Sequence, residues 1–272
     1  MATRRVTVET GTVSFDHGAQ YLPASDSAFA HTMRAAAGRG WLSDDTLVGV
    51  PGMSSLPRAL ADGLNISQQV EITRLVHQDD CWHLTGPKGQ YSARSVVLAI
   101  PAPQARALLG DADPLAADLS RVIMSPCLAL MAALPTDSPR PFPHRVDPAH
   151  PLAWIAQDSS KPGRSAAAVA WVAQAGPAFS AMHLEQTPEA IAALMLPLLC
   201  DVIGADPDQM LHVQAHRWRY AQTAKPLGQP FLQDHGRSLY VGGDWCLGPR
   251  AEHAWHSGRE IAREIRESAH VV

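Results

Sequence analysis

The stretch Leu239-Tyr240-Val241-Gly242-Gly243-Asp244 is the most informative part of the sequence, because a short apolar run ends abruptly in two glycines and a carboxylate. The run Leu239-Tyr240-Val241 is typical of a buried strand. The glycines let the backbone approach a ligand closely, and Asp244 offers a carboxylate to a ligand hydroxyl. A Gly-Asp turn after a strand is most often only a turn. Taken alone, the stretch leaves both interpretations open.

A final amphipathic helix is predicted shortly after this turn. Trp255, Gly258, Ile261, Ala262 and Ile265 recur at helical spacing. The start of such a helix presents backbone N–H groups without intrahelical partners, together with the positive end of the helix dipole. The strand, the glycine turn and the helix are therefore compatible with a site for an electron-rich group, and taken alone they are weak evidence for one.

The segment 66–100 is predicted to form a small meander that leads into a buried strand. Val70, Ile72 and Val76 repeat with a period of two, and residues 81–85 continue with a second strand-like pattern after a polar turn. The run 95–100 shows no alternation, which is typical of a strand buried on both faces. Pro101 and Pro103 end this strand, and a helix is expected to follow.

Three further helices are indicated by capping residues and apolar spacing. They cover residues 26–37, a short segment from Ser54 or Ser55 to about 62, and residues 188–203, which Gly204 ends. Pro197 lies inside the last of these and should kink it. In contrast, the stretch 136–163 is rich in proline and polar residues and is predicted to form surface loops.

Composition excludes several classes of protein. The 272 residues can form one large domain or two interleaved ones. A net charge of −4 gives no electrostatic reason to expect a nucleic-acid partner. The 4 cysteines form no CxxC pair, and the longest apolar stretch, 190–199, is too short to span a bilayer. With no secretory signal pattern at the start, a cytoplasmic protein without membrane partners is expected.

Two kinds of catalytic site find no support in the motifs. Although the chain has 13 histidines, no HExxH or comparable ligand set occurs, and His212 and His216 fall in a strand-like pattern. The GxSxG motif of serine hydrolases is also missing. Neither a metal site nor a serine nucleophile is predicted.

Four separated blocks carry a more specific signal. The first combines Met1-Ala2-Thr3-Arg4-Arg5 with Phe15-Asp16-His17-Gly18-Ala19-Gln20-Tyr21, and the second is Pro51-Gly52-Met53-Ser54. The third is Val97-Leu98-Ala99-Ile100-Pro101-Ala102-Pro103-Gln104, and the fourth pairs residues 216–221 with Gly243-Asp244-Trp245-Cys246. With the loop Ser159-Ser160-Lys161-Pro162-Gly163-Arg164, these blocks resemble the renalase-like branch of the flavin-dependent amine-oxidase superfamily over nearly the whole chain.

This resemblance implies an α/β fold, that of a two-domain flavoprotein of the α+β kind. A Rossmann-like FAD-binding domain, here incomplete, would comprise residues 1–25, 51–115 and 236–272. It would be interleaved with a sheet-plus-helix substrate domain of residues 26–50 and 116–235. The resemblance also implies an FAD-dependent oxidoreductase that takes hydride from a small-molecule substrate, a dihydropyridine isomer of NAD(P)H or an amine. The flavin then passes the electrons to O2, giving hydrogen peroxide. No catalytic side chain is strictly required, because the flavin is the electrophile.

The resemblance also implies roles for individual residues. Gln20 and Tyr21 would lie at the flavin ring, Glu71 would use its backbone toward the adenine end, and Gly243 and Asp244 would hold the ribityl–pyrophosphate region. The neighbourhood of the ring would include Ala251, and the residues facing substrate would be Tyr21, Leu128 and Trp245. Without these blocks, core aromatic packing would explain Tyr21 and Trp245 equally well.

The sequence departs from the family pattern in several places. No GxGxxG turn for the pyrophosphate occurs in the 272 residues. In the family, the Met-Ala-Thr-Arg-Arg block follows an opening βαβ unit on the order of 30 residues. His253 replaces a usual glycine, and Leu128 stands where an aromatic residue is common. Two hypotheses follow: a flavoenzyme whose start lies upstream, or a truncated, non-catalytic relative that cannot hold FAD.

Overall fold

The computed structural model describes residues 1–43 and 47–269. The chain divides into two compact units, the first formed by Met1–Asp62 and Ser125–Ala221 and the second by Gly63–Met124 and Gln222–Val272. Residues 44–46 and 270–272, which belong to the ranges predicted for the substrate and FAD-binding domains, lie outside the described residues. The predicted assignment of ranges to a cofactor domain and a substrate domain stays a prediction.

The first unit is built on a five-stranded sheet with the order β11-β7-β10-β9-β8. Its strands are β7 (Ile123–Leu134), β8 (His144–Val146), β9 (Trp154–Gln157), β10 (Val169–Gln174) and β11 (His212–Lys225). The pairs β7–β10, β10–β9 and β9–β8 are antiparallel. Antiparallel strands can be joined by short connections, which is how β8 and β9 form a hairpin.

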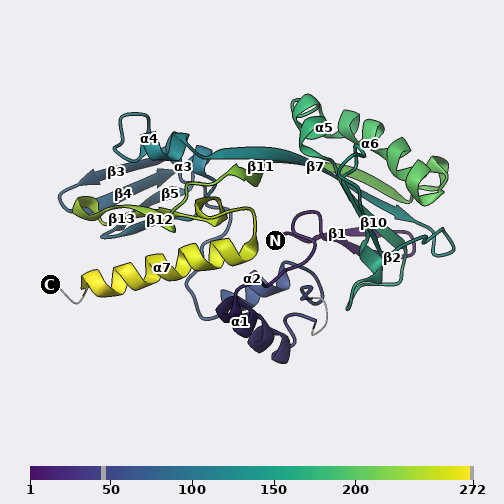
Figure 1. The fold of residues 1–272 in the computed structure, drawn as a ribbon, viewed down its shortest axis with the longest axis horizontal. Helices are drawn as coiled ribbons and strands as arrows, with labels where there is room; N and C mark the ends of the chain where they lie inside the picture. Colours follow the sequence, from purple (N-terminus) through teal and green to yellow (C-terminus); the bar gives the residue numbers. More distant parts are fainter. Residues whose placement is uncertain (44–46, 270–272) are drawn as a thin grey trace. The chain divides into compact units, whose positions relative to one another are not determined.

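Helices α5 (Pro177–Met182) and α6 (Pro188–Ile203) cover one face of this sheet (Figure 1). Thr187 caps α6 by accepting a hydrogen bond from the N–H of Ala190, and Gly204 ends it in a left-handed conformation, as predicted. The helix contributes apolar residues at helical spacing to the core beneath it: Ile191, Met195, Leu199 and Ile203. The helix continues through Pro197.

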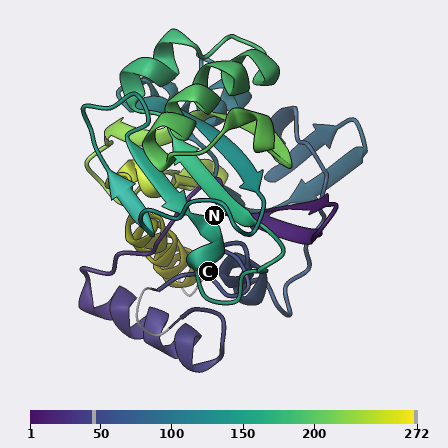
Figure 2. The same cartoon turned by 90° about the vertical axis from the view of Figure 1, so that its right-hand side faces the viewer.

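The opposite face of the sheet carries the hairpin of β1 (Arg4–Val8) and β2 (Gly11–Phe15), drawn in purple in Figure 2. Successive side chains of a strand point to opposite faces. Leu130 and Ala132 of β7 therefore belong to the core under α6, whereas Met131 and Ala133 pack with Phe15 of the hairpin. Both faces of the central strands are buried, which explains why their sequences are continuously apolar.

Two helices follow the hairpin in the chain. The first is α1 (Ser27–Gly38), whose first turn is capped by the side chain of Asp26. The second is α2 (Ser55–Leu60), which begins after Ser54 without a side-chain cap. Both helices predicted in this region are confirmed, with ends shifted by one or two residues, as is usual for helix termini.

The second unit contains two three-stranded sheets, with the orders β12-β13-β6 and β3-β4-β5. The first consists of β6 (Val96–Leu98), β12 (Phe231–Asp234) and β13 (Leu239–Gly242), and β13 runs parallel to β6. The second is an antiparallel meander of β3 (Arg74–Gln78), β4 (Cys81–Gly86) and β5 (Gly89–Ala93). The helices of the second unit are α3 (Ala102–Leu109), α4 (Ala116–Ser120) and α7 (Ala251–Ala269).

Four short 3₁₀ turns complete the described elements. They are η1 (Asp158–Ser160), η2 (Pro207–Gln209), η3 (His235–Arg237) and η4 (Asp244–Cys246). Two of them lie in blocks that the sequence singled out: η4 follows β13 directly, and η1 begins the loop that contains Lys161 and Arg164.

The strand predicted to include Val70 and Ile72 begins later than expected, because β3 starts only at Arg74. Residues 70–72 precede it without regular pairing, and an ideal Cβ on Gly86 would lie 1.8 Å from the carbonyl oxygen of Glu71. The backbone of Glu71 therefore packs directly onto β4, where a side chain larger than glycine would prevent the approach.

Two other expectations are corrected. The stretch 136–163, expected to be surface loops, contains β8 and β9, since pairing with β10 draws it into the sheet. Val97 was expected to be buried on the second face of its strand, yet its side chain is 43% exposed. Val96 and Leu98 face the core, and the pleat turns Val97 to the other side.

Candidate functional site

Four charged side chains are buried together in the first unit. They form what is called here the buried charge cluster: Asp16, Asp158, Lys161 and Arg164, whose side chains are at most 3% exposed. Asp16 follows the end of β2, Asp158 begins η1, and the two cations lie in the loop after it. Two negative and two positive charges balance, as burial of ionised groups requires.

Asp16 is the hub of the cluster. One carboxylate oxygen, Oδ1, accepts hydrogen bonds from Thr3 Oγ1 at 2.6 Å and from the backbone N–H of Met53 at 2.9 Å. The other, Oδ2, accepts from Arg164 Nη2 and lies 3.5 Å from Lys161 Nζ. A single carboxylate thus ties together three segments that are far apart in the sequence.

Asp158 supplies the second carboxylate. Its Oδ2 accepts the backbone N–H of Asp16 at 2.9 Å, and its Oδ1 accepts from Lys161 Nζ. Burial raises the pKa of Asp158 above its ordinary value, while the nearby Lys161 ammonium acts in the opposite direction. The fixed cations of the cluster thus favour the ionised carboxylate, which burial disfavours.

The cluster borders on Gln20 and Tyr21, two predicted site residues. Lys161 Nζ donates to Gln20 Oε1 at 2.8 Å and lies 5.4 Å from the centroid of the Tyr21 ring. Gln20 Nε2 donates to the carbonyl oxygens of Asp16 and, at 3.3 Å, of Gly18. Burial, and secondarily the charge of Asp158, raises the pKa of the Tyr21 phenol. The structure therefore brings Gln20 and Tyr21 together around one ammonium group.

Tyr21 also contacts two aromatic residues of the hairpin β8–β9. Its ring centroid lies 5.8 Å from that of His144 and 5.7 Å from that of Trp154, which stack on each other at 5.4 Å. Trp154 lies in the stretch that the sequence assigned to loops, and it had been given no role. The result is a cluster of three rings beside the buried lysine.

Histidines are gathered on the other side of the same segment. His17 stacks on Trp218 with 5.3 Å between ring centroids and meets the edge of His216 at 4.9 Å. Burial lowers the pKa of His17 to about 4, and burial together with the charge of Arg4 lowers the pKa of His216. These rings are therefore neutral in the folded protein at neutral pH and act as aromatic packing.

The second unit holds the glycine turn and its carboxylate. The backbone N–H of Gly243 donates to Ser257 Oγ at 3.0 Å, and an ideal Cβ on Gly242 would lie 2.5 Å from the same oxygen. Helix α7 thus packs against the end of β13 at a distance that only glycine permits. Asp244 is half-buried, its Oδ1 accepts from the backbone N–H of Trp245 at 2.9 Å, and burial raises its pKa.

The remaining predicted residues of the second unit have defined surroundings. Trp245 is 1% exposed, belongs to the core, and donates its indole N–H to the carbonyl of Ile100 at 2.9 Å. Ala251 is the first residue of α7, and Glu71 uses its carbonyl oxygen to pack on Gly86. The roles predicted for these residues toward a cofactor or substrate stay predictions.

Leu128 lies in the first unit, fully buried in the core under α6. Within the described chain it packs against core residues, and its predicted contact with substrate stays a prediction. The predicted site residues thus fall into two groups: Gln20, Tyr21 and Leu128 in the first unit, and Glu71, Gly243, Asp244, Trp245 and Ala251 in the second.

Sequence reasoning gave no role to the members of the buried charge cluster. Asp16 belongs to the same block as Gln20 and Tyr21, and Lys161 and Arg164 belong to the Ser-Ser-Lys-Pro-Gly-Arg loop. The sequence did contain one clue to these residues: Asp16, Lys161 and Arg164 lie in two of the segments that carry the family resemblance. What the sequence did not contain was their pairing, because the two blocks are about 140 residues apart.

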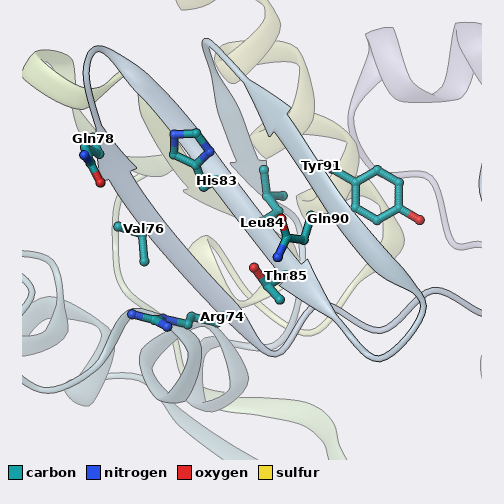
Figure 3. A pocket seen from close by; sticks show the side chains of 8 residues that line it. All are labelled: Arg74, Val76, Gln78, His83, Leu84, Thr85, Gln90 and Tyr91. Atoms are coloured by element: carbon teal, nitrogen blue, oxygen red, sulfur yellow. The ribbon is translucent and has the colours of Figure 1, made fainter.

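A shallow hollow of about 300 Å³ lies on the exposed face of the meander β3–β4–β5 (Figure 3). Its lining is polar and spread along the strands, with Arg74 and Gln78 on β3 and Thr85 and Gln90 on β4 and β5. None of the buried charged or aromatic groups described above lines this hollow, so it lacks the features of a functional site.

Among the described residues, no group of three or more histidine, cysteine or acidic side chains has the geometry to hold a metal ion. Across the same part of the chain, none of the helices has both the length and the apolar character needed to cross a membrane.

The fold and these sites define a mixed α/β protein with a glycine–carboxylate turn in one unit and a buried ionic cluster in the other. The sequence matches the family described as flavin containing amine oxidoreductase over residues 9–266, and the chain belongs to that family. The family implies a flavin cofactor, and the matched residues 9–266 cover most of both units.

Two solved structures have a similar fold. One is cyclohexylamine oxidase from Brevibacterium oxydans IH-35A, with a TM-score of 0.60, 16% identity, and coverage of 80% of this chain and 53% of that one. Another is a protein assigned as a protoporphyrinogen oxidase from Exiguobacterium sp. 255-15, with a TM-score of 0.55, 17% identity, and coverage of 79% and 52%. The chain therefore spans about half the length of these proteins.

Proposed function

We propose that this chain is an FAD-dependent oxidoreductase that removes hydride from a small organic molecule and passes the electrons to O2. The observation that carries the proposal is the Gly243-Asp244 turn between the buried strand β13 and helix α7, in a chain of the flavin amine oxidoreductase family. When bound, the flavin supplies the two-electron chemistry, and the protein's part is to bind and orient.

The turn in the second unit fits the ribityl–pyrophosphate part of FAD. Gly242 lets α7 approach β13 closely, as the 2.5 Å from its ideal Cβ to Ser257 Oγ illustrates. A half-buried carboxylate whose pKa is raised by burial gains stability from a ligand hydroxyl that donates to it. Asp244 is therefore proposed to accept from a hydroxyl, and Gly243 and Ala251 to lie along the cofactor.

Gln20 and Tyr21 are proposed to contact the flavin ring in the first unit, with Tyr21 also facing substrate. Gln20 accepts a hydrogen bond from Lys161 of the buried charge cluster, and the Tyr21 ring lies beside the same ammonium. Preorganised contacts of this kind lower the entropy lost on binding. The proposed substrates are a dihydropyridine isomer of NAD(P)H or an amine; a cytoplasmic location is part of the same proposal.

FAD binding is the direct test. The purified 272-residue chain is titrated with FAD, and bound flavin is followed through its absorbance and the quenching of its fluorescence. Saturable one-to-one binding is expected, with D244A weakening it by about tenfold or more, since it loses a charge-assisted hydrogen bond. Asp111 is an exposed partner of Arg106, and D111A is the matched control that should bind like the wild type.

A second candidate function is a non-catalytic relative that holds no flavin, because no GxGxxG occurs in the sequence. Absence of flavin binding in the titration supports this candidate and overturns the first. If FAD binds, peroxide release is measured with dihydropyridine isomers of NAD(P)H and with amines in parallel, which separates the two proposed substrate classes.

A further inference from the structure

The hydrogen bonds around Lys161 leave this residue no capacity for a ligand. An ammonium has three donors and no acceptor. Lys161 Nζ lies 2.8 Å from Gln20 Oε1, donates to Asp158 Oδ1, and lies 3.5 Å from Asp16 Oδ2. All three donors therefore point to protein oxygens, and the side chain is 3% exposed.

The same contacts fix the orientation of the Gln20 amide. Its oxygen faces a group that can only donate, and its nitrogen faces the carbonyl oxygens of Asp16 and Gly18, which can only accept. Rotating the amide by half a turn would place NH₂ against the ammonium and an oxygen against two carbonyl oxygens. Both N–H groups are thereby used within the protein, and Oε1 keeps one lone pair.

We propose that Lys161 is a positioning residue that locks the Gln20 side-chain amide in this orientation, so that Gln20 can offer a ligand only a hydrogen-bond acceptor. The inference rests on the proposed function where it takes that ligand to be a flavin. The flavin ring carries both N–H donors and carbonyl acceptors along its edges. Gln20 therefore selects an N–H group of the ring and rejects a carbonyl edge, where two oxygens would face each other.

Loss of the ammonium should release the amide. In K161M the apolar stem remains, while Gln20 Oε1, Asp158 and Asp16 lose a common donor. K161R keeps a cation that can donate hydrogen bonds but cannot accept them, so it should preserve the orientation of the Gln20 amide. Lys88 lies exposed in the turn between β4 and β5, and K88M is the matched control for removal of a lysine charge.

The readout is the side-chain NH₂ signal of Gln20 in a proton–nitrogen correlation spectrum, assigned by its disappearance in Q20L. In the wild type and K88M, these protons should exchange slowly with solvent. In K161M the signal should shift toward that of an exposed glutamine and exchange at least about tenfold faster, and K161R should restore slow exchange. An unchanged shift and exchange rate in K161M overturns the proposal.

Two further measurements keep the test decisive. If K161M does not fold, the double variant K161M/D158N removes one charge of each sign, and its Gln20 signal is examined in the same way. FAD affinity is measured in parallel and should fall about tenfold in K161M relative to the wild type. Equal FAD affinity of K161M and wild type overturns the ligand part of the inference. Failure of the wild type to bind FAD rejects the proposed function, while the exchange data still decide the orientation of Gln20.

Discussion

The backbone N–H of Asp16 donates to the carboxylate of Asp158 at 2.9 Å, although 142 residues separate them in the chain. Through this bond the end of the hairpin β1–β2 is fixed to the turn η1. Both carboxylates also contact Lys161, which donates to Gln20, so this contact helps to position the segment 16–21.

Replacement of Asp158 should destabilise the protein strongly. D158N removes one of two negative charges and leaves Lys161 and Arg164 sharing Asp16 alone, and unpaired buried charge is costly. A loss of about 3–5 kcal/mol in the free energy of unfolding is expected from urea denaturation. The exposed pair Arg106–Asp111 provides the comparison, where D111N should cost less than about 1 kcal/mol. Similar losses in both variants would contradict the view that the buried cluster is ionised.

Acid should destabilise the first unit through His17. Its pKa is lowered by burial to about 4 in the folded protein, from an ordinary value of 6.5. Below pH 6.5 the unfolded chain binds a proton that the folded chain does not, so stability falls as the pH falls, by at most about 1.4 kcal/mol per pH unit. The decline should end near pH 4, where the folded protein is protonated too.

The measurement is the free energy of unfolding between pH 4 and 7 for the wild type and H17F. The variant should show a shallower dependence, and H31Q, which changes an exposed histidine of α1, should follow the wild type. Asp158 has the opposite effect on stability, because a raised pKa in the folded state favours folding as the pH falls. For this reason only the difference between the wild-type and H17F curves reports on His17. Parallel curves for wild type and H17F would show that His17 titrates normally.

A methyl group at Gly86 should disturb the segment before β3. The ideal Cβ lies 1.8 Å from the carbonyl oxygen of Glu71, so the backbone must shift in G86A. The expected loss of stability is about 1–3 kcal/mol, and FAD affinity should fall further if Glu71 uses its backbone toward the adenine. Gly258 of α7 is the control, because no atom lies within 4 Å of an ideal Cβ there. G258A should stabilise the helix by about 0.5–1 kcal/mol. A G86A protein as stable as the wild type would refute the tight packing of Glu71 on β4.

Trp245 should behave first as a core residue. In W245F the carbonyl of Ile100 loses the indole N–H that lies 2.9 Å away, and a loss of about 1–3 kcal/mol is expected from thermal or urea unfolding. The partly exposed Trp41 is the control, with W41F expected to change stability by no more than about 0.5 kcal/mol. If W245F altered substrate oxidation while leaving stability unchanged, its role would be that of the substrate wall rather than the core.

Local pattern was sufficient for elements whose residues carry their own signals. The Ala-rich pattern that begins at Asp26 predicted α1 within one or two residues. The capped start at Thr187, the terminal Gly204 and the helical spacing from Ile191 to Ile203 predicted α6 equally closely. The strand β13 and the helix α7 were also predicted, since an apolar run, a glycine pair and a 3.6-residue period are properties of short windows.

Elements that depend on a partner strand could not be predicted in the same way. The hairpin β8–β9 lies in a stretch rich in proline and polar residues, and it is a pair of strands only because β10 pairs with β9. Similarly, Val70 and Ile72 alternate like a strand, but the packing of Glu71 on Gly86 starts β3 later. Pairing and close approach are tertiary properties that override local propensity.

By itself the sequence determined the family, the glycine–carboxylate turn and the expectation that Gln20 and Tyr21 belong to the site, because these are encoded in contiguous blocks. Only the tertiary structure decided how Gln20 is held. Asp16, Asp158, Lys161 and Arg164 are ordinary charged residues in the sequence, and they become a buried, mutually neutralised cluster when the fold brings two distant loops together. The physical reason is that charge can leave water only when opposite charge and hydrogen-bond partners accompany it, and those partners come from segments that no local pattern connects.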